Sequence, residues 1–489
     1  MSTSPSGLAA LYRPALGLLT DLYQLTMAAG YHAAGLGGHE AVFHLYFRKA
    51  PFGGSYAVTA GQETALEFLE GLRFASEDLD FLATLTGNDG KPLFTEDFLA
   101  MLGGLSFQAD VDGIPEGRVA LPHEPILRLQ GPLIQLQLVE TALLAILNFQ
   151  TLIATKAARV KLAAAGRTVL EFGLRRAQGI DGGLSASRAA WVGGVDATSN
   201  VLAGRLFGIP VRGTHAHSWV LSFDREVEAF ETYAAALPNN CTFLVDTYDT
   251  VTGVQRAAAV GQSLRARGFE MAGVRLDSGD LADLSRKARA LLDAAGEPQA
   301  KVVASNDLDE QRVAALVAAG APIDVFGVGT RLVTGGDQSA LGGVYKLAAI
   351  RAPGGPWRDR VKKSEEPAKI SLPGPLGVRR QVVDGQFVGD ILYNVGRPLS
   401  SAGPVDRLGR PVDLEPGAGE ELLVPLLRGG ARVEPAEGLS AARGRAAADL
   451  ASLPAAVRRL EQPAPAPMGL DRGLYDETQR LLAIGGGAS

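Results

Sequence analysis

The middle of the chain contains four short apolar segments that each end in polar residues: Phe243-Leu244-Val245-Asp246, Val274-Arg275-Leu276-Asp277, Val302-Val303-Ala304-Ser305-Asn306 and Val325-Phe326-Gly327-Val328-Gly329-Thr330. Their ends recur roughly every 23 to 31 residues, the length of a strand, a loop, a helix and a return turn. The spacing therefore predicts consecutive βα units of a parallel sheet or barrel. Because the loops after such strands leave from one face, we expect the polar residues to converge on one site.

Two earlier segments extend the series. Thr168-Val169-Leu170-Glu171 precedes Phe172, and Ile209-Pro210-Val211 precedes a segment that contains His215 and His217. On an extended chain the two histidines, two residues apart, point to the same side. A histidine at this face is a candidate acid, base, nucleophile or metal ligand. The alternative is a core histidine held by hydrogen bonds, and the strand-end position favours function for one of the two.

The composition is that of a globular protein. The chain has 489 residues, 46% hydrophobic and 20% charged, and is long enough for two or three domains. A net charge of -6 lacks the basic surface that nucleic acids require, although a local basic pocket for a phosphorylated ligand is compatible with it. Cys241 is the only cysteine, which excludes an intramolecular disulfide and a multi-cysteine zinc site and fits a reducing compartment.

Targeting and membrane signals are not evident. Met1 to Gly30 lacks the pattern of a signal peptide. The most hydrophobic long stretch, Leu133 to Ala165, is interrupted by glutamine, glutamate, asparagine and lysine, which makes it too polar for a spanning helix. We therefore expect a cytoplasmic protein without a membrane partner.

Three regions are expected along the chain. Residues 1–135 form an N-terminal α+β domain, with a strand over 41–47 and a helix over 62–72. Residues 136–350 form the α/β barrel that carries the polar strand ends. Residues 351–489 form a C-terminal region of short strands and helices that partly completes the N-terminal layer.

Further motifs are spread in order over nearly the whole chain. They are Thr20-Asp21-Leu22-Tyr23-Gln24-Leu25-Thr26-Met27, Phe47-Arg48, Glu171-Phe172-Gly173-Leu174-Arg175-Arg176, Ser199-Asn200, Gly213-Thr214-His215-Ala216-His217-Ser218, Arg275-Leu276-Asp277-Ser278-Gly279-Asp280 and Gly342-Gly343-Val344-Tyr345-Lys346. Together they resemble the nicotinate phosphoribosyltransferase family, which is of the type II phosphoribosyltransferase kind. The resemblance implies an irregular (β/α) barrel with an N-terminal α+β domain, and a homodimer with shared active sites.

The activity implied by the resemblance is a step of NAD salvage. Nicotinate reacts with phosphoribosyl pyrophosphate to give nicotinate mononucleotide and pyrophosphate, with ATP as a co-substrate that phosphorylates a histidine. By this resemblance His217 is the phosphorylated residue and Asp246 orients its imidazole. Asp277 would stabilise a cationic, oxocarbenium-like ribose, with Arg275 beside it. His215 is then expected to be structural.

Nicotinate is a flat anion, so its pocket needs an aromatic face and a cation. Phe172 and Tyr23 are the aromatic candidates, and the family implies that Tyr23 reaches the site of the neighbouring subunit. Arg175 and Arg275 are the cationic candidates, with one for the carboxylate and the other for phosphate. Thr214 is a further donor.

The phosphates are expected at loops that follow strands. Ser305, Asn306, Gly329 and Thr330 lie where barrels bind phosphate through loop amides and helix N-termini. Arg48 and Lys346 resemble the family's basic contacts to the diphosphate.

A magnesium ion is implied with phosphoribosyl pyrophosphate and ATP. Asp277 and Asp280 are its candidate ligands, most of its other positions being taken by substrate oxygens and water. The alternative for Asp280 is a helix N-cap.

Asp196 matches an acidic residue that helps to recognise the amide in related nicotinamide enzymes. An ionised carboxylate there would repel nicotinate, so we expect Asp196 to point elsewhere, and nicotinamide phosphoribosyltransferase is the near alternative. Quinolinate phosphoribosyltransferase, which needs a more basic pocket, is more distant. Two other classes are a non-catalytic barrel that senses phosphosugars or nucleotides, and a hydrolase or aldolase with a metal at His215 and His217.

Overall fold

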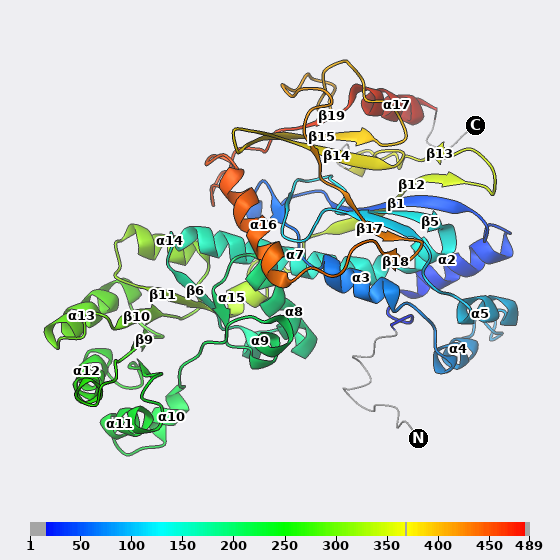
Figure 1. Cartoon of the computed structure of the whole chain (residues 1–489). Helices are drawn as coiled ribbons and strands as arrows, with labels where there is room; N and C mark the ends of the chain where they lie inside the picture. Colours follow the sequence, from blue (N-terminus) through cyan, green and yellow to red (C-terminus); the bar gives the residue numbers. More distant parts are fainter. Residues whose placement is uncertain (1–15, 367–368, 485–489) are drawn as a thin grey trace. The chain divides into compact units, whose positions relative to one another are not determined.

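The computed structural model describes residues 16–366 and 369–484. The chain divides into two compact units, one made of residues up to 151 together with those from 341 onward, the other of residues 152–340 (Figure 1). The first unit is therefore built from both ends of the chain. The second contains all the polar strand ends that the sequence singled out.

The first unit contains a seven-stranded sheet within its described part. Its order is β13-β12-β1-β5-β3-β17-β18, with β1 Glu40–Phe47, β3 Asp110–Gly113, β5 Leu127–Pro132, β12 Gly343–Arg351, β13 Arg358–Asp359, β17 Val424–Arg428 and β18 Ala431–Arg432. β1 pairs antiparallel with both β5 and β12. Its β-branched and aromatic residues are buried from Ala41 to Phe47, so the strand predicted there is confirmed.

Shorter strands and helices surround this sheet. The strands are β2 Ala57–Val58 with β4 Val119–Ala120, and a sheet of β14 Leu376–Val383, β15 Gln386–Asn394, β16 Glu420–Glu421 and β19 Met468–Leu470. The helices are α2 Leu22–Ala33, η1 Pro51–Gly53, α3 Gln62–Glu70, α4 Ser76–Ala83, α5 Glu96–Gly103, α6 Leu133–Leu138, α16 Leu439–Ser452 and α17 Arg472–Ala483. The predicted helix over 62–72 is confirmed as α3, which ends at Glu70.

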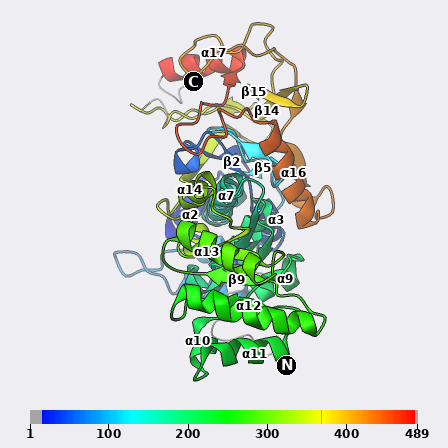
Figure 2. The same cartoon turned by 90° about the vertical axis from the view of Figure 1, so that its left-hand side faces the viewer.

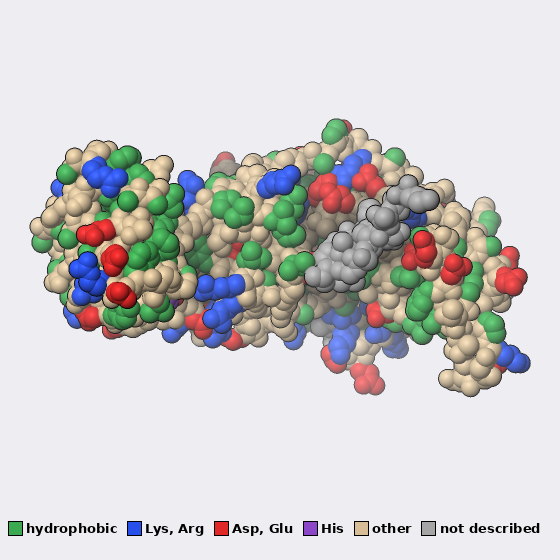
Figure 3. All heavy atoms as spheres, turned by 90° about the horizontal axis from the view of Figure 1, so that it is seen from below, with side chains coloured by type: hydrophobic (Ala, Val, Ile, Leu, Met, Phe, Trp, Pro, Cys, Tyr) green, Lys and Arg blue, Asp and Glu red, His purple; other side chains and the backbone are tan. Residues whose placement is uncertain are grey.

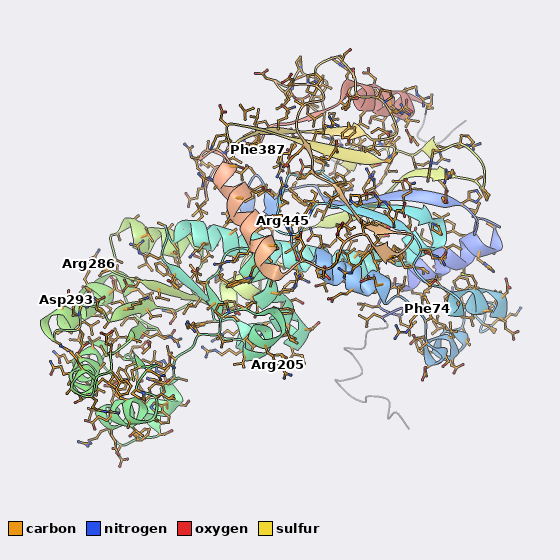
Figure 4. All side chains as sticks on the ribbon, in the orientation of Figure 1. Phe74, Arg205, Arg286, Asp293, Phe387 and Arg445 are labelled. Atoms are coloured by element: carbon orange, nitrogen blue, oxygen red, sulfur yellow. The ribbon has the colours of Figure 1, made fainter. Side chains whose placement is uncertain are left out.

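The C-terminal residues are attached to the N-terminal part by specific contacts. Figure 1 and Figure 2 both show the β14–β15 layer between α17 and the seven-stranded sheet. Arg445 on α16 donates to the Glu116 carbonyl at 2.8 Å (Figure 4). β17 pairs with β3 of the N-terminal part. The C-terminal strands and helices are thus an integral part of the first unit.

The second unit is a parallel sheet flanked by helices. Its described strands run in the order β7-β6-β11-β10-β9-β8, with β6 Thr168–Glu171, β7 Ala197–Thr198, β8 Thr242–Leu244, β9 Gly273–Leu276, β10 Lys301–Ala304 and β11 Val325–Val328. The four apolar segments are parallel neighbours, so the α/β class and the parallel core are confirmed. Among the described strands β7 and β8 are the outer ones, and closure into a barrel stays a prediction.

The helices of this unit follow the strands in turn. They are η2 Leu174–Arg176, α8 Gly179–Val192, α9 Val201–Phe207, α10 His217–Leu221, α11 Glu226–Ala236, α12 Thr250–Ala266, α13 Leu281–Ala294, α14 Glu310–Ala318 and α15 Thr330–Val333. Figure 2 shows α12 and α13 side by side. Asp249, Asp280 and Asp309 each cap one of these helices by accepting from backbone N–H groups of its first turn, which sets where the loops after the strands end.

The helix α7, Glu140–Ala163, is long and apolar enough to cross a membrane by length and composition alone. The prediction that this stretch is too polar therefore does not hold for the helix as a whole. However, 67% of its most apolar window is buried inside the structure, which is typical of a core helix in a soluble protein.

Candidate active site

Arg275 on β9 is the centre of a polar network at the ends of neighbouring strands. Its Nε donates to Ser305 Oγ at 2.9 Å, and its Nη2 donates to Asp277 Oδ1 at 3.0 Å. Its Nη1 donates to Thr214 Oγ1 at 3.3 Å. Ser305 also donates to Asp277 Oδ1. Four of the predicted site residues thus meet, and a half-buried guanidinium is held from three sides.

Phe172 provides the aromatic face predicted beside this network. The Cζ atom of Arg275 lies 5.5 Å from the centre of the Phe172 ring, within the range of a cation–π contact. Gly327 leaves room for the ring, because a Cβ atom there would lie 2.7 Å from Phe172 Cδ2. The pair presents a flat surface beside a cation, which suits an aromatic acid.

Glu171, just before Phe172, holds this strand end in place. The carboxylate is buried and accepts from Ser187 Oγ at 2.9 Å, from Thr198 Oγ1 at 2.5 Å and from the Gly173 N–H. Glu171 stands at the start of the Glu171–Arg176 motif, but no role was predicted for it. The available signal was a carboxylate at a buried strand end, which requires several donors.

His217 begins α10 and is partly exposed. Its Nδ1 lies 3.2 Å from Thr247 Oγ1, and its Nε2 lies 3.9 Å from Asp277 Oδ2. Asp246, expected to orient the imidazole, instead accepts from the Asp277 N–H at 3.1 Å and from Ser278 Oγ at 2.6 Å. In this arrangement Thr247 contacts the imidazole, and Asp246 fixes the loop that carries Asp277.

His215 has the contacts of a structural residue. Its Nε2 accepts from the Leu244 N–H at 3.2 Å, and its Nδ1 lies 3.4 Å from the Ala216 carbonyl. Burial lowers the pKa of His215. The ring packs against Phe230 and Tyr233. A neutral imidazole with its proton on Nδ1 satisfies both hydrogen bonds.

The loops expected to bind phosphate have unusual backbone conformations. Asn306 and Asp307 adopt positive φ angles of 102° and 51°, and Arg312 donates to the carbonyls of both. Such strain at non-glycine residues occurs often at functional loops. Gly329 precedes α15, whose first residue is Thr330, and a Cβ atom at Gly329 would lie 3.1 Å from the Phe172 carbonyl.

The remaining predicted residues of this unit have less specific surroundings. Arg175 is exposed in η2. Asp280 Oδ1 accepts from the N–H groups of Ala282 and Asp283, so it is the helix cap considered above. Within residues 16–366 and 369–484, no group of three or more histidine, cysteine, aspartate or glutamate residues is arranged to hold a metal ion.

Asp196 is engaged away from the aromatic ring. Its Oδ2 lies 2.5 Å from Lys161 Nζ and accepts from the Val169 N–H at 2.8 Å. Val169 is near the start of β6, whereas Phe172 follows the end of that strand. The carboxylate is therefore paired with a cation at the opposite end of β6, which agrees with the prediction that Asp196 points elsewhere.

Three predicted residues belong to the first unit. Tyr23 lies on α2 with 49% of its surface exposed. Arg48 follows β1, and Lys346 lies on β12, where its Nζ donates to the Tyr345 carbonyl at 2.8 Å. Burial lowers the pKa of Lys346, and the charges of Arg48 and Lys362 lower it further. Arg48 and Lys346 therefore belong to one cationic group.

The surface drawn in Figure 3 carries lysine and arginine among aspartate and glutamate, and neither sign forms a continuous field on that face. A parallel α/β core with a guanidinium, an aromatic ring and a carboxylate at its strand ends fits a phosphoribosyltransferase that acts on an aromatic acid. Family models agree with this class. The nicotinate phosphoribosyltransferase N-terminal domain matches residues 18–148, and the nicotinate phosphoribosyltransferase family matches residues 168–354.

The chain belongs to the nicotinate phosphoribosyltransferase family. It is 48% identical to the nicotinate phosphoribosyltransferase of Bacillus subtilis over 75% of this chain and 73% of that protein. It is 37% identical to the Homo sapiens nicotinate phosphoribosyltransferase over 95% and 96%. The resemblance predicted from the motifs is confirmed, and the chain is an enzyme of nicotinate phosphoribosylation in NAD salvage.

Solved structures show the same fold. The crystal structure of human nicotinic acid phosphoribosyltransferase superposes with a TM-score of 0.81 at 34% identity, covering 94% of this chain and 99% of that one. The nicotinate-nucleotide pyrophosphorylase of Pyrococcus furiosus superposes with a TM-score of 0.69 at 20% identity, covering 92% and 98%. The second likeness concerns the fold alone.

Proposed function

We propose that the Phe172–Arg275 pair binds nicotinate for transfer to phosphoribosyl pyrophosphate. An arginine carries five N–H donors, and three of those of Arg275 donate to Ser305, Asp277 and Thr214. Two remain for the nicotinate carboxylate while the pyridine ring stacks on Phe172. This geometry is the observation that carries the proposal, and Arg175 is left for phosphate.

In the transfer step the pyridine nitrogen forms a bond to the anomeric carbon of the ribose. The bond from that carbon to the pyrophosphate oxygen breaks, and pyrophosphate leaves. The ribose becomes oxocarbenium-like on the way, and Asp277 Oδ2 supplies a negative charge to stabilise it. Arg48 and Lys346 are the proposed contacts to the leaving diphosphate, and the loops at Asn306 and at Gly329–Thr330 are the proposed contacts to the ribose phosphate.

The carboxylates at the strand ends fit a magnesium ion that arrives with the substrates. Asp246 Oδ1 is buried without a hydrogen-bond partner among the described atoms, and Mg²⁺ prefers such oxygens. Asp246 and Asp277 are the proposed ligands, with the other positions taken by substrate oxygens and water, whereas Asp280 caps α13. When bound, the ion supplies neutralisation of the diphosphate charge.

ATP is the proposed co-substrate, acting through His217. With its Nδ1–H donated to Thr247, the imidazole presents an unprotonated Nε2 that can accept the γ-phosphoryl group. The bond between the β and γ groups of ATP breaks, ADP leaves, and phosphohistidine forms. The network of Asp246 and Ser278 positions Asp277 next to this nitrogen.

We further propose a cytoplasmic homodimer with shared active sites. Leu22, Tyr23 and Met27 on α2 are exposed at 52%, 49% and 38%, and apolar residues exposed on one helix fit a contact with a partner subunit. Tyr23 would then complete the nicotinate pocket of the partner subunit.

The test is mononucleotide formation by the purified protein with phosphoribosyl pyrophosphate and magnesium. Nicotinate or nicotinamide is supplied, each with and without ATP. Product from nicotinate, increased by ATP, is expected. Product from nicotinamide but not from nicotinate would overturn the assignment of the base. Binding of phosphoribosyl pyrophosphate without product from nicotinate or nicotinamide would favour a non-catalytic barrel that senses phosphosugars or nucleotides.

A further inference from the structure

A cationic cluster in the first unit includes a residue that the sequence did not single out. A small cavity brings together residues that lie far apart in the chain: His44, Tyr46, His123, Lys346, Ser371, Leu372, Leu376 and Arg407. Arg407 comes from the loop between β15 and β16 and donates from Nη2 to the Ile370 carbonyl at 2.6 Å. The guanidinium is thereby directed into the cavity and away from bulk water.

Arg48, Lys346 and Arg407 form this cluster without neutralising partners. Among the described residues, none of the three forms an ion pair, although many other arginines of the chain do. Arg48 Nε is buried with no hydrogen-bond partner. Burying unpaired cations together is unfavourable. The arrangement is accounted for if an anion neutralises them during function.

The titration behaviour of the cluster agrees with its geometry. Burial lowers the pKa of Arg407, and the charge of Arg48 lowers it further. Burial also lowers the pKa of His123 to about 3, with Arg407 and Arg48 adding to the shift. His123 packs against Tyr46 at 5.9 Å between ring centres. It is therefore a neutral hydrogen-bonding group at the edge of a positive field.

Two carboxylates lie within electrostatic range but do not neutralise the cluster. Glu140 acts on Lys346, while its Oε2 accepts from Gln24 at 2.9 Å. Glu366 interacts with the charge of Arg48, but it forms its ion pair with Lys369, at 2.6 Å.

We propose that Arg407 binds the diphosphate of phosphoribosyl pyrophosphate together with Arg48 and Lys346, so that the C-terminal part of the chain supplies a substrate-binding residue. This inference rests on the proposed function for the identity of the anion. The cavity itself is about 10 Å³, smaller than one phosphate, so the anion sits at its mouth. There the three half-buried side chains supply charge and N–H donors.

The test uses pyrophosphate and magnesium, titrated into the full-length protein by calorimetry. Arg407→Gln removes the charge but keeps a donor for the Ile370 carbonyl. We expect it to weaken pyrophosphate binding about tenfold, the usual effect of losing one charge-assisted contact. Arg410→Ala is the matched control, because Arg410 is exposed and pairs with Asp406 at 2.6 Å. It should bind pyrophosphate like the wild type.

Steady-state kinetics distinguish a loss of substrate binding from a general loss of structure. Arg407→Gln should raise the KM for phosphoribosyl pyrophosphate about tenfold while the KM for nicotinate changes less than about twofold. Wild-type pyrophosphate affinity in Arg407→Gln would overturn the inference. If Arg407→Gln does not fold, Arg407→Met, which also lacks the charge, is measured instead, with weakened binding supporting the role and unchanged binding refuting it. If the wild type makes no mononucleotide but binds pyrophosphate through Arg407, the proposed function fails and the anion site stands.

Discussion

Arg275 lies over the Phe172 ring, with 5.5 Å between its Cζ atom and the ring centre. The contact joins β9 to the end of β6, two strands that are not neighbours in the sheet. The same guanidinium also contacts Ser305 and Asp277. In the proposed site, binding of the base and stabilisation of the ribose would therefore be coupled through one side chain.

We predict that Arg275→Lys raises the KM for nicotinate by tenfold or more. Lysine keeps the charge but cannot donate to three partners and the carboxylate at once. Steady-state kinetics with each substrate varied in turn would measure the effect. Arg286→Lys, at an exposed position on α13, is the control. An unchanged KM in Arg275→Lys would assign the carboxylate to Arg175 instead.

His217→Ala is predicted to abolish the stimulation by ATP while leaving slow transfer to nicotinate without ATP. The substitution removes the nitrogen that accepts the phosphoryl group but leaves Arg275, Phe172 and Asp277 in place. Protein labelling from γ-labelled ATP, alongside mononucleotide formation, gives the measurement. His32→Ala, at a surface residue paired with Asp97, should retain the label. Persistent labelling of His217→Ala would place the phosphoryl group elsewhere.

Thr247→Val should reduce coupling to ATP about tenfold with little change in the KM for nicotinate. Valine has the same shape but removes the hydroxyl group 3.2 Å from His217 Nδ1, so the tautomer and orientation of the ring are no longer fixed. The ratio of ATP hydrolysed to mononucleotide formed is the quantity to follow. Thr247→Ser should restore it, and a failure of serine to do so would argue for a packing role.

Local patterns were sufficient to predict the parallel strands and the residues at their ends, because each apolar segment is complete within a few positions. The partner of His217 was not predictable in this way. Asp246 and Thr247 are adjacent in the chain, and side-chain direction alone decides that Thr247 contacts the ring. Arg407 was not predictable either. It lies in a loop without periodicity, and only the fold brings it close to Arg48 and Lys346.

We predict that Glu171→Gln lowers the free energy of unfolding by about 1–3 kcal/mol. The buried carboxylate accepts hydrogen bonds from three donors, those of Ser187, Thr198 and the Gly173 N–H. In glutamine one oxygen is replaced by an NH₂ group, which would place a donor against one of these donors. Urea unfolding would measure the loss. Glu231→Gln, on the exposed side of α11, should change stability by less than about 0.5 kcal/mol. Equal stabilities of the two variants would contradict this account.

His44 on β1 should make the protein less stable in acid. Burial, followed by the charge of Arg128, lowers the pKa of His44 from 6.5 to about 3, and its Nε2 accepts from the Leu376 N–H at 3.1 Å. Between these pH values the unfolded chain binds a proton at His44 that the folded chain does not bind. The free energy of unfolding therefore falls as the pH drops from about 6.5 towards about 3. His44→Gln keeps an acceptor without titrating. Between pH 5 and 6 its unfolding free energy should depend on pH less steeply than that of the wild type, by up to about 1.4 kcal/mol per pH unit, and equal slopes would show that His44 is not the group responsible.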